Sequence, residues 1–282
     1  MTEASALLAE AARRLQVAGV ESPRLDARLL LARALGRRAD SLVGPVEIPT
    51  DAVARFDDFI GRRLRREPVA YITGHKEFWS LDFEVGPGVL APRPETETLI
   101  ELALERLPDR AATLTAVDLG TGSGCLLAAF LSEYPNGQGV GVDVSADALV
   151  WAKRNIERLG LASRCRLELA DWNDFFVAGP DVVFANPPYI ASEDIPCLAP
   201  DVRLYEPISA LDGGDGGLAA LRSLSRQMAR LLRSQGLGFI EIGAGQAEAA
   251  GGIFEEAGLK VAEIALDLAG IPRGMVVNHP PA

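Results

Sequence analysis

The tetrapeptide Asn186-Pro187-Pro188-Tyr189 could hold a planar group that carries an –NH2. Its two prolines lock the backbone and lack N–H donors, so carbonyl oxygens are left as hydrogen-bond acceptors. The side-chain oxygen of Asn186 is a further acceptor, and Tyr189 offers a flat face. Two acceptors around an –NH2 group would bind both hydrogens and point the nitrogen lone pair toward a methyl donor. The tetrapeptide predicts methyl transfer to an amide or amine nitrogen, with a chance turn as the alternative.

A glycine-rich turn follows Asp118 between an expected strand and an expected helix. Glycines let the backbone turn sharply and lie close to a ligand, and the next helix presents free N–H groups. Dinucleotide enzymes use G-x-G-x-x-G at the same place, whereas this turn reads G-x-G-x-G and lacks the Lys-Ser/Thr ending of a phosphate-binding loop. We therefore expect a ligand without phosphate, against the alternative of tight packing alone. The expected cofactor-binding residues are Gly120, Thr121, Gly122, Ser123 and Gly124.

Acidic residues end the next two expected strands. Asp143 lies about 20 residues beyond the glycine turn, where a carboxylate can accept hydrogen bonds from both hydroxyls of a ribose. By itself it could equally cap the helix that begins near Ala146. In Asp171-Trp172 the carboxylate can meet an adenine amino group while the indole of Trp172 covers the ring. A core tryptophan is the alternative.

These residues lie in a stretch of alternating strands and helices, which predicts a mostly parallel sheet with helices on both faces. We expect an α/β catalytic domain over residues 92–282. Its start, rich in proline, is expected to be irregular up to about Thr113. The expected strands are 114–118, 139–144, 166–169, 181–184, 237–242, 261–266 and 275–277, and the expected helices are 125–133, 147–159, 218–232 and 246–257.

The first part of the chain has a different pattern. Apolar residues recur at helical spacing, and Ser22-Pro23 and Thr50 mark helix starts, so residues 1–68 predict a small helical bundle. Between 69 and 91 strand-favouring residues such as Tyr71 and Ile72 predict a linking β-hairpin, with Gly74 at a possible turn. Because the bundle carries no cofactor pattern, we expect it to recognise the substrate.

Composition excludes several classes. With 28 Lys and Arg against 39 Asp and Glu, the net charge is -11, which disfavours free nucleic acid as a partner. The three cysteines are scattered and only two histidines accompany them, so we expect reduced thiols and no metal site. No basic, apolar leader and no apolar run of about 20 residues is present, so we expect a cytoplasmic protein without a membrane segment.

The chain resembles the release-factor glutamine methyltransferases, the PrmC/HemK family, within the class I S-adenosylmethionine-dependent enzymes. The resemblance covers nearly the whole chain and is most specific in the Arg-Pro-Glu-Thr-Glu stretch. Only the run from Ile271 to Met275, with its proline and glycine, departs from the expected strand start. The segments that carry it are Leu25-Asp26-Ala27-Arg28-Leu29-Leu30, Tyr71-Ile72-Thr73-Gly74, Glu77-Phe78-Trp79, Pro92-Arg93-Pro94-Glu95-Thr96-Glu97, Tyr205-Glu206-Pro207, Asp212-Gly213-Gly214-Asp215-Gly216-Gly217-Leu218 and Glu241-Ile242-Gly243.

The resemblance implies a Rossmann-like class I methyltransferase sheet and S-adenosyl-L-methionine as the methyl donor. It implies that the substrate is the glutamine of the Gly-Gly-Gln motif in class I peptide chain release factors. Asn186 and Pro187 would hold the amide, Tyr189 would pack against it, and Pro188 would complete the substrate site. Asn186 would also border the cofactor. We expect a monomer, and the roles of Arg93 and Glu95 stay open.

Three other functions compete with this interpretation. A glutamine methyltransferase of the same family could act on a ribosomal protein, which the site motifs do not exclude. An N6-adenine nucleic-acid methyltransferase would also use Asn-Pro-Pro-Tyr, although the acidic charge balance disfavours it. A non-catalytic adaptor would keep the fold without the reaction, and the intact glycine turn and Asn186 argue against that.

Overall fold

The computed structural model describes residues 2–37 and 47–281, which fall into two compact units. The first comprises residues 1–75 and 199–205, and the second comprises residues 76–198 and 206–282. The segment 38–46, part of the predicted bundle, lies outside the described residues. The first unit contains β1 (Thr2–Glu3), α1 (Ala4–Val17), α2 (Pro23–Ala34), β2 (Glu47–Ile48), α3 (Thr50–Leu64), α4 (Val69–Thr73) and α8 (Pro200–Tyr205).

The first unit is predominantly helical, as its apolar periodicity predicts. Leu15 of α1, Leu30 of α2 and Phe56 of α3 are buried in one hydrophobic cluster, which is how amphipathic helices of this length become stable. Pro23 begins α2 at the position where a missing N–H costs nothing, although the side chain of Ser22 makes no capping hydrogen bond.

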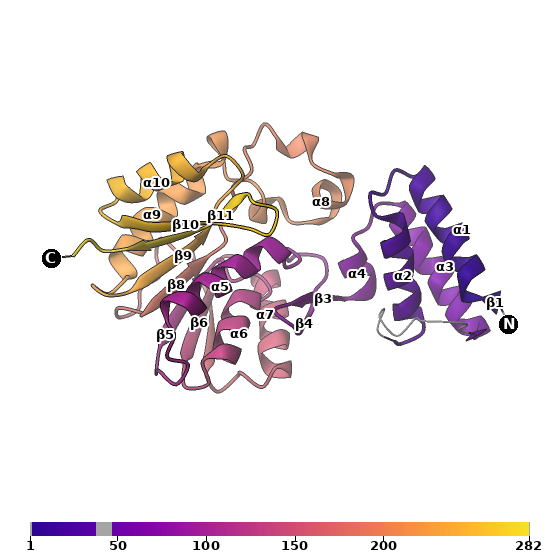
Figure 1. Ribbon diagram of the computed structural model, residues 1–282, viewed down its shortest axis with the longest axis horizontal. Helices are drawn as coiled ribbons and strands as arrows, with labels where there is room; N and C mark the ends of the chain where they lie inside the picture. The colour runs from indigo at the N-terminus through magenta and orange to yellow at the C-terminus, as the bar shows by residue number, and fades with distance from the viewer. Residues whose placement is uncertain (1, 38–46, 282) are drawn as a thin grey trace. The chain divides into compact units, whose positions relative to one another are not determined.

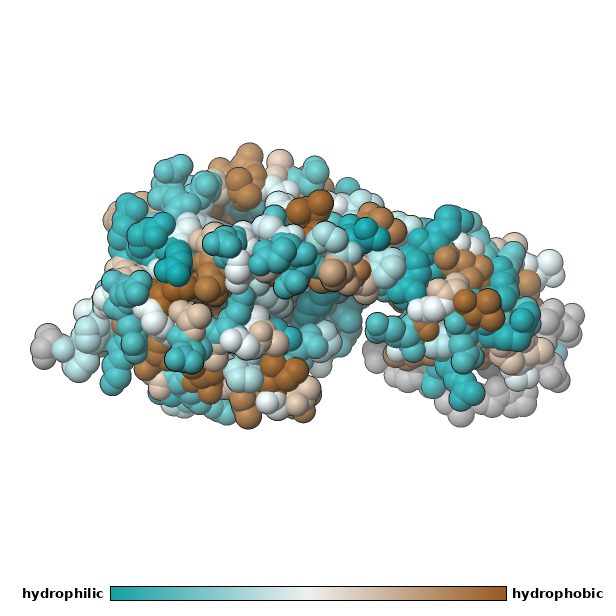
Figure 2. Space-filling model, turned by 90° about the horizontal axis from the view of Figure 1, so that it is seen from above, coloured by the Kyte–Doolittle hydropathy of each residue, from teal (hydrophilic) through white to brown (hydrophobic). Residues whose placement is uncertain are grey.

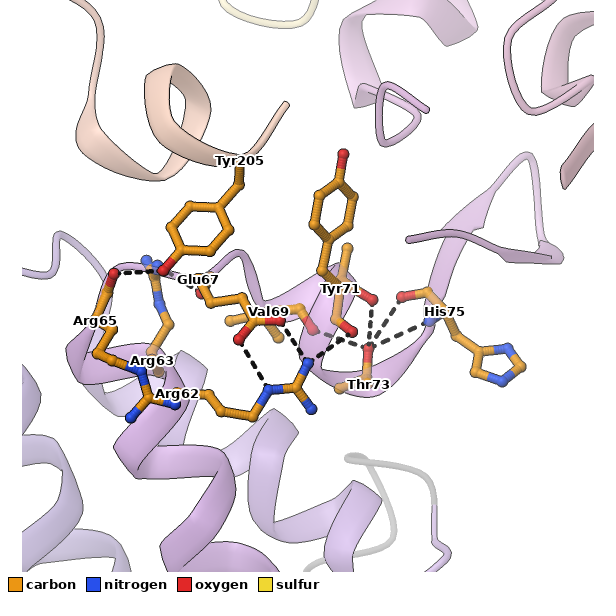
Figure 3. A network of polar contacts seen from close by, with 10 residues as sticks. Arg62, Arg63, Arg65, Glu67, Val69, Tyr71, Thr73, His75 and Tyr205 are labelled. Atoms are coloured by element: carbon orange, nitrogen blue, oxygen red, sulfur yellow. Dashed lines mark hydrogen bonds and ion pairs between the residues drawn. The ribbon is translucent and has the colours of Figure 1, made fainter. Parts of the chain in front are cut away.

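The short helix α8 joins this unit although it lies far along the chain. Arg63 of α3 is buried and donates to Asp26 at 2.7 Å and to Asp201 at 3.1 Å. The hydroxyl of Tyr205 donates to the carbonyl of Arg65 at 2.7 Å (Figure 3). These contacts fix α8 against the end of α3, so the segment that follows Asn-Pro-Pro-Tyr packs partly with the N-terminal helices.

The predicted hairpin is wrong in its first part. Val69–Thr73 forms the helix α4, and Gly74, with φ of +75°, ends it instead of turning a hairpin. Ile72 packs into the cluster of the helical unit, so tertiary burial overrides the strand preference of its side chain. In the close view of this region, the Thr73 hydroxyl donates to the carbonyl of Val69 at 3.0 Å, one turn earlier (Figure 3).

The hairpin itself is shorter than predicted. It consists of β3 (His75–Phe78) and β4 (Leu81–Glu84), which pair in a two-stranded sheet. Trp79 and Ser80 turn the chain with φ of 53° and 58°, the left-handed values that a tight two-residue hairpin turn requires at both positions. The predicted linker of residues 69–91 is thus divided, because residues 69–75 belong to the first unit and residues 76–91 to the second.

The second unit is built on a seven-stranded sheet of order β10-β11-β9-β8-β5-β6-β7. The five strands from β9 to β7 in this order run parallel, whereas β11 pairs antiparallel with β9 and with β10. Helices α9 and α10 lie on one side of the sheet and α5, α6 and α7 on the other (Figure 1). The strands are β5 (Thr115–Leu119), β6 (Gln138–Asp143), β7 (Cys165–Leu169), β8 (Val182–Ala185), β9 (Leu237–Glu241), β10 (Lys260–Leu266) and β11 (Pro272–Asn278), and the helices are α5 (Glu97–Arg106), α6 (Cys125–Glu133), α7 (Ala146–Arg158), α9 (Ala219–Leu231) and α10 (Ala247–Glu256).

This architecture confirms the predicted α/β sheet. Strands β5 to β10 and helices α6, α7, α9 and α10 match their predicted bounds within one residue at each end. The run with a proline and a glycine does not delay β11, which begins at Pro272. The helix α5 is preceded by a 3-10 turn at Pro94–Thr96 and was not predicted. Because of the prolines before it, irregular structure was expected up to about Thr113, beyond the end of this helix.

Two features are absent from the described ranges, 2–37 and 47–281. None of their helices is long and apolar enough to cross a membrane. Within the same ranges, no three His, Cys, Asp or Glu side chains gather where they could hold a metal ion. Cys125, Cys165 and Cys197 are all free.

Candidate active site

A pocket opens at the carboxyl ends of the central parallel strands. The chain leaves β5 toward β6 on one side and later returns to β8 on the other, which creates the crevice where open α/β sheets bind ligands. Among the described residues, predicted Gly124, Pro187 and Tyr189 do not line this pocket. The predicted site residues that line it are Gly120, Thr121, Gly122, Ser123, Asp143, Trp172, Asn186 and Pro188.

The glycine turn follows β5 and folds over the end of β6. Gly120, Gly122 and Gly124 have φ of 78°, 56° and 79°, a left-handed conformation that glycine adopts without the strain other residues incur. The N–H groups of Gly120 and Thr121 donate to the carbonyl of Val142 at 2.8 and 2.9 Å. Gly124 caps α6 and faces Ala152 of α7, so it serves the packing of the turn and not the pocket wall.

Asp143, the last residue of β6, connects the glycine turn to the next helix. Its carboxylate accepts from the N–H of Gly122 and from the N–H of Ser145, both at 2.8 Å. The N-cap of α7 is Ser145, whose hydroxyl accepts from the N–H of Ala148 at 3.2 Å. Burial raises the pKa of Asp143, and the two N–H donors oppose that shift. The capping alternative for Asp143 is therefore taken by Ser145, and the carboxylate remains on the pocket wall.

Two buried polar atoms beneath the turn lack partners among the described residues. Asp118 accepts from the hydroxyl of Thr121 at 2.7 Å through one oxygen, while its Oδ1 has no hydrogen-bond partner. The hydroxyl of Ser123, on the pocket wall, also has none. Burial raises the pKa of Asp118 to about 7. A pocket of left-handed glycines, a carboxylate and an unsatisfied hydroxyl fits a polar ligand that carries amine or hydroxyl donors.

Trp172 forms the opposite wall of the cofactor side. Its ring lies 3.5 Å from the place where a Cβ on Gly120 would stand, which is an ordinary van der Waals distance, so it is the φ of 78° and not the indole that favours glycine there. The indole N–H donates to the hydroxyl of Ser223 at 3.0 Å, which holds the ring. Asp171 also lines the pocket, and its carboxylate accepts from the backbone and side chain of Asn173 at 2.9 and 2.8 Å.

Asn186 follows β8 and is held from behind. Its side-chain nitrogen donates to the hydroxyl of Thr96 at 3.1 Å, and that hydroxyl donates to Glu241 at the end of β9. The other oxygen of Glu241 accepts from the hydroxyl of Tyr189 at 3.0 Å. Burial raises the pKa of Glu241, while Thr96, Tyr189 and Arg273 oppose the shift. These contacts engage the side-chain nitrogen of Asn186 on the side of Thr96 and Glu241.

Pro187 and Tyr189 support Asn186 from the interior. Pro187 is buried, and Pro188 alone of the two prolines reaches the pocket wall. The ring of Tyr189 lies 5.9 Å from the guanidinium of Arg273, within cation–π range. Burial, together with the neighbouring Glu241 carboxylate, raises the pKa of Tyr189 well above its usual range, so the phenol keeps its proton.

Four residues of the site carried no predicted role. Arg93 lines the pocket and pairs with the buried carboxylate of Glu206. Thr96 and Glu241 lie in segments that carry the family resemblance, but only the hydrogen bond between them in the structure indicates what they do. Asn155 of α7, fully buried, donates to the carbonyl of Ser123 at 3.0 Å and exchanges two hydrogen bonds with Glu84 of β4. Asn155 thus joins the hairpin to the glycine turn. The only sign of this role in the sequence was an asparagine within the predicted helix 147–159.

Comparison with known proteins gives matches along the chain. Residues 6–74 match the PrmC N-terminal domain, and residues 111–242 match a methyltransferase domain. A crystal structure of a methyltransferase from Pyrococcus furiosus superimposes with a TM-score of 0.53 at 18% identity, over 77% of this chain and 97% of that one. This likeness confirms the class of fold.

Curated relatives extend over most of the chain. The release factor glutamine methyltransferase of Rhodospirillum rubrum is 43% identical, over 97% of this chain and 84% of its own. That of Cereibacter sphaeroides is 42% identical over the full length of both chains, and that of Caulobacter vibrioides is 41% identical over 90% and 89%. Identity at this level over whole chains reflects common descent of both units. The chain belongs to the release factor glutamine methyltransferase family.

Proposed function

We propose that this protein transfers a methyl group from S-adenosyl-L-methionine to the side-chain amide nitrogen, N5, of the glutamine in the Gly-Gly-Gln motif of class I peptide chain release factors. The observation that carries the proposal is the placement of Asn186 on the wall of the same pocket as the glycine turn and Asp143. Family membership supports the substrate, because the relatives are named for it.

The cofactor side of the pocket offers donors and acceptors that suit S-adenosylmethionine. Asp143 would accept from the ribose hydroxyls, and Trp172 would cover the adenine. The turn from Gly120 to Ser123 would lie along the amino-acid part, with the unpartnered hydroxyl of Ser123 and the backbone available to it. Bound there, S-adenosylmethionine supplies a methyl group on a positively charged sulfur.

The substrate side must make a weak nucleophile react. An amide nitrogen is poorly nucleophilic because its lone pair is delocalised into the carbonyl. We assign the side-chain oxygen of Asn186 and the backbone oxygen of Pro187 to the two N–H groups of the glutamine, which fixes its direction of approach. Pro188, on the pocket wall, would complete the surface against which the amide packs, and Tyr189 would support Asn186 from behind that wall. No general base is needed, since the nitrogen becomes strongly acidic as the new bond forms.

We also assign substrate recognition to the N-terminal unit. The α/β unit already holds every cofactor and amide residue named above, which leaves the helices free for contacts with the release factor away from its glutamine. Binding energy from remote contacts can orient the reacting group, so these contacts should raise turnover as well as affinity. The match to the PrmC N-terminal domain over residues 6–74 supports a conserved purpose for this part.

A monomeric, cytoplasmic enzyme fits the surface and the composition. Hydrophobic residues are interspersed with hydrophilic ones on the face shown in Figure 2, without one large apolar area. The net charge of -11 favours repulsion between copies and disfavours free nucleic acid or an acidic membrane as a partner. Light scattering coupled to size exclusion tests the monomer, and a dimer mass would overturn it.

The central test is mass spectrometry of a class I release factor after incubation with the protein and S-adenosylmethionine. We expect one added methyl group on the Gly-Gly-Gln glutamine. A release factor with glutamate at that position, which lacks the amide nitrogen, is the matched control and should stay unmodified. Methylation only of a ribosomal protein glutamine, or only of adenine in nucleic acid, would replace the proposed substrate.

Recognition by the N-terminal unit is tested with the full chain. Deleting residues 1–68 would also remove the partners of α8, because Arg63 and the carbonyl of Arg65 hold Asp201 and Tyr205. We therefore compare kcat/KM on the intact release factor and on a short Gly-Gly-Gln peptide. We expect the peptide to be much the weaker substrate, in kcat as well as KM. Equal values would show that remote contacts contribute nothing.

A further inference from the structure

The side chain of Asn186 is half-buried at the end of a hydrogen-bonded chain that crosses the second unit. Its nitrogen donates to Thr96, and Thr96 donates to Glu241. The three residues come from the 3-10 turn before α5, the end of β8 and the end of β9, and lie 90 and 145 positions apart along the sequence. Thr96 and Glu241 are 2% and 1% exposed, so water has no access to replace either partner.

The direction of each hydrogen bond follows from the number of hydrogens available. An ionised carboxylate only accepts, and a hydroxyl has one hydrogen to donate. The phenol of Tyr189 occupies one oxygen of Glu241, and the hydroxyl of Thr96 occupies the other. With its hydrogen committed to Glu241, the Thr96 oxygen can only accept from Asn186. The –NH2 of Asn186 must therefore face Thr96.

An amide can present either end because its oxygen and nitrogen ends have nearly the same shape. Packing around Asn186 distinguishes them poorly, whereas a hydrogen-bonded neighbour that only accepts distinguishes them well. A reversed amide would aim N–H groups at the N–H groups of the substrate, and the acceptor needed for orientation would be lost. The reaction thus depends on which end of Asn186 meets the pocket.

We propose that Thr96 and Glu241 are positioning residues that set the direction of the Asn186 amide, so that its oxygen and not its –NH2 meets the substrate nitrogen. This inference rests on the proposed methyl transfer to an amide. Neither residue touches the reacting atoms in this scheme, since Thr96 acts on Asn186 and Glu241 acts on Thr96. Arg273 supports the charged form of Glu241 from β11, while Glu95 opposes it.

Substitution of Glu241 by glutamine should reverse the chain of hydrogen bonds. The glutamine oxygen can still accept from Tyr189, which places its –NH2 toward Thr96. Thr96 then receives a hydrogen bond from position 241 and is free to donate its own hydrogen to Asn186. In that arrangement the oxygen of Asn186 faces Thr96 and its –NH2 faces the pocket, which is the reverse of the direction that the reaction needs.

The experiment compares Thr96→Val, Thr96→Ser, Glu241→Gln and the double variant Thr96→Val/Glu241→Gln in the full-length protein. Thr98→Val is the matched control. Thr98 is also a buried threonine, two positions after Thr96, and it does not belong to the hydrogen-bonded chain of Asn186, Thr96, Glu241 and Tyr189. The measurements are kcat and KM on a release factor and the Kd for S-adenosylmethionine. A second readout is the side-chain amide signal of Asn186 in 15N–1H spectra without substrate.

We expect Thr96→Val to lower kcat about 10-fold and Glu241→Gln to lower it about 10- to 100-fold, with cofactor Kd changed by less than about 3-fold. Thr96→Ser should restore kcat to within about 3-fold of the wild type, and Thr98→Val should match it. The double variant should be no worse than the poorer single variant, because both act through one contact. The Asn186 signal should move in Thr96→Val and stay in Thr98→Val.

Several results would overturn the inference. An unchanged kcat in Thr96→Val removes the positioning role, and equal losses in Thr96→Ser and Thr96→Val show that side-chain volume matters and not the hydroxyl. Additive losses in the double variant contradict a single chain of contacts. If the wild type leaves release factor glutamine unmethylated, the proposed function fails instead. The Asn186 amide signal then still decides whether Thr96 holds the amide.

Discussion

The two sides of the pocket are held together in different ways. On the cofactor side, the hydrogen bond between Gly122 and Asp143 joins residues 21 positions apart in the sequence, and that between Thr121 and Asp118 joins residues 3 positions apart. On the substrate side, Thr96 forms hydrogen bonds with Asn186, 90 positions away in the sequence, and with Glu241, 145 positions away. The glycine turn and Asp143 need only one strand–helix–strand unit, to which Trp172 is added from beyond β7, whereas the substrate side exists only after β8, β9 and the segment before α5 have assembled. The comparison predicts that cofactor binding and turnover respond to different substitutions.

The largest separation should come from Asn186→Ala. Loss of the pocket acceptor should reduce kcat about 100-fold or more, as removal of one preorganised hydrogen-bonding group from an active site does. Most of the affinity for S-adenosylmethionine should remain, because the glycine turn and Asp143 are untouched. Kinetics and calorimetry measure the two quantities, with Asn136→Ala as a control on an exposed asparagine. Full activity would remove the tetrapeptide from the mechanism.

Asp143→Ala should have the opposite profile. Each lost charge-assisted hydrogen bond to a ribose hydroxyl is worth about 1.5–3 kcal/mol, so the Kd for S-adenosylmethionine should rise at least about 10-fold. Calorimetry on the variant measures this directly. Asp147→Ala is the matched control, since Asp147 lies four positions after Asp143 in the sequence, is exposed and does not line the pocket. An unchanged Kd in Asp143→Ala would exclude the ribose assignment.

Asp118 predicts a dependence of stability on pH that belongs to the cofactor side. Its pKa is raised from 3.8 to about 7, so between these values the folded protein holds a proton that the unfolded chain has released. The stability from this group is complete below pH 3.8 and falls by about 1.4 kcal/mol per pH unit until about pH 7. Asp118→Asn lacks this slope. Urea denaturation of both proteins across this range should give diverging curves, and parallel curves would contradict the assignment.

The smallest effect should come from Ser145→Ala at the start of α7. Its hydroxyl accepts from the N–H of Ala148 at 3.2 Å, and loss of such a cap typically lowers the free energy of unfolding by about 1 kcal/mol. Ser145→Asp, which can accept the same hydrogen bond, should recover most of the loss. Chemical denaturation monitored by circular dichroism measures both. If alanine and aspartate have the same stability, the cap contributes nothing here.

Sequence patterns predicted most elements of the second unit because its strands and helices have distinct periodicities. The helix α6 has the predicted bounds Cys125–Glu133, and the parallel strands begin and end within one residue of expectation. The failures occurred where local preference and tertiary burial disagree. Ile72 has a strand-favouring side chain, yet it lies in α4 because its burial among the N-terminal helices outweighs that preference. Pro94 likewise concealed α5, although proline is tolerated at a helix start.

The sequence by itself determined which chemical groups the glycine turn, the end of β6 and the tetrapeptide bring to the site. The left-handed glycines, Asp143 at a strand end and the donor-poor Asn-Pro-Pro-Tyr run are local features, and local features can be read from residue type and spacing. Only the tertiary structure decided which of these groups face the pocket and in which direction. It placed Tyr189 behind the wall and turned the nitrogen of Asn186 toward Thr96. Hydrogen-bond direction depends on the partner's donors and acceptors, and here that partner is 90 positions away along the chain.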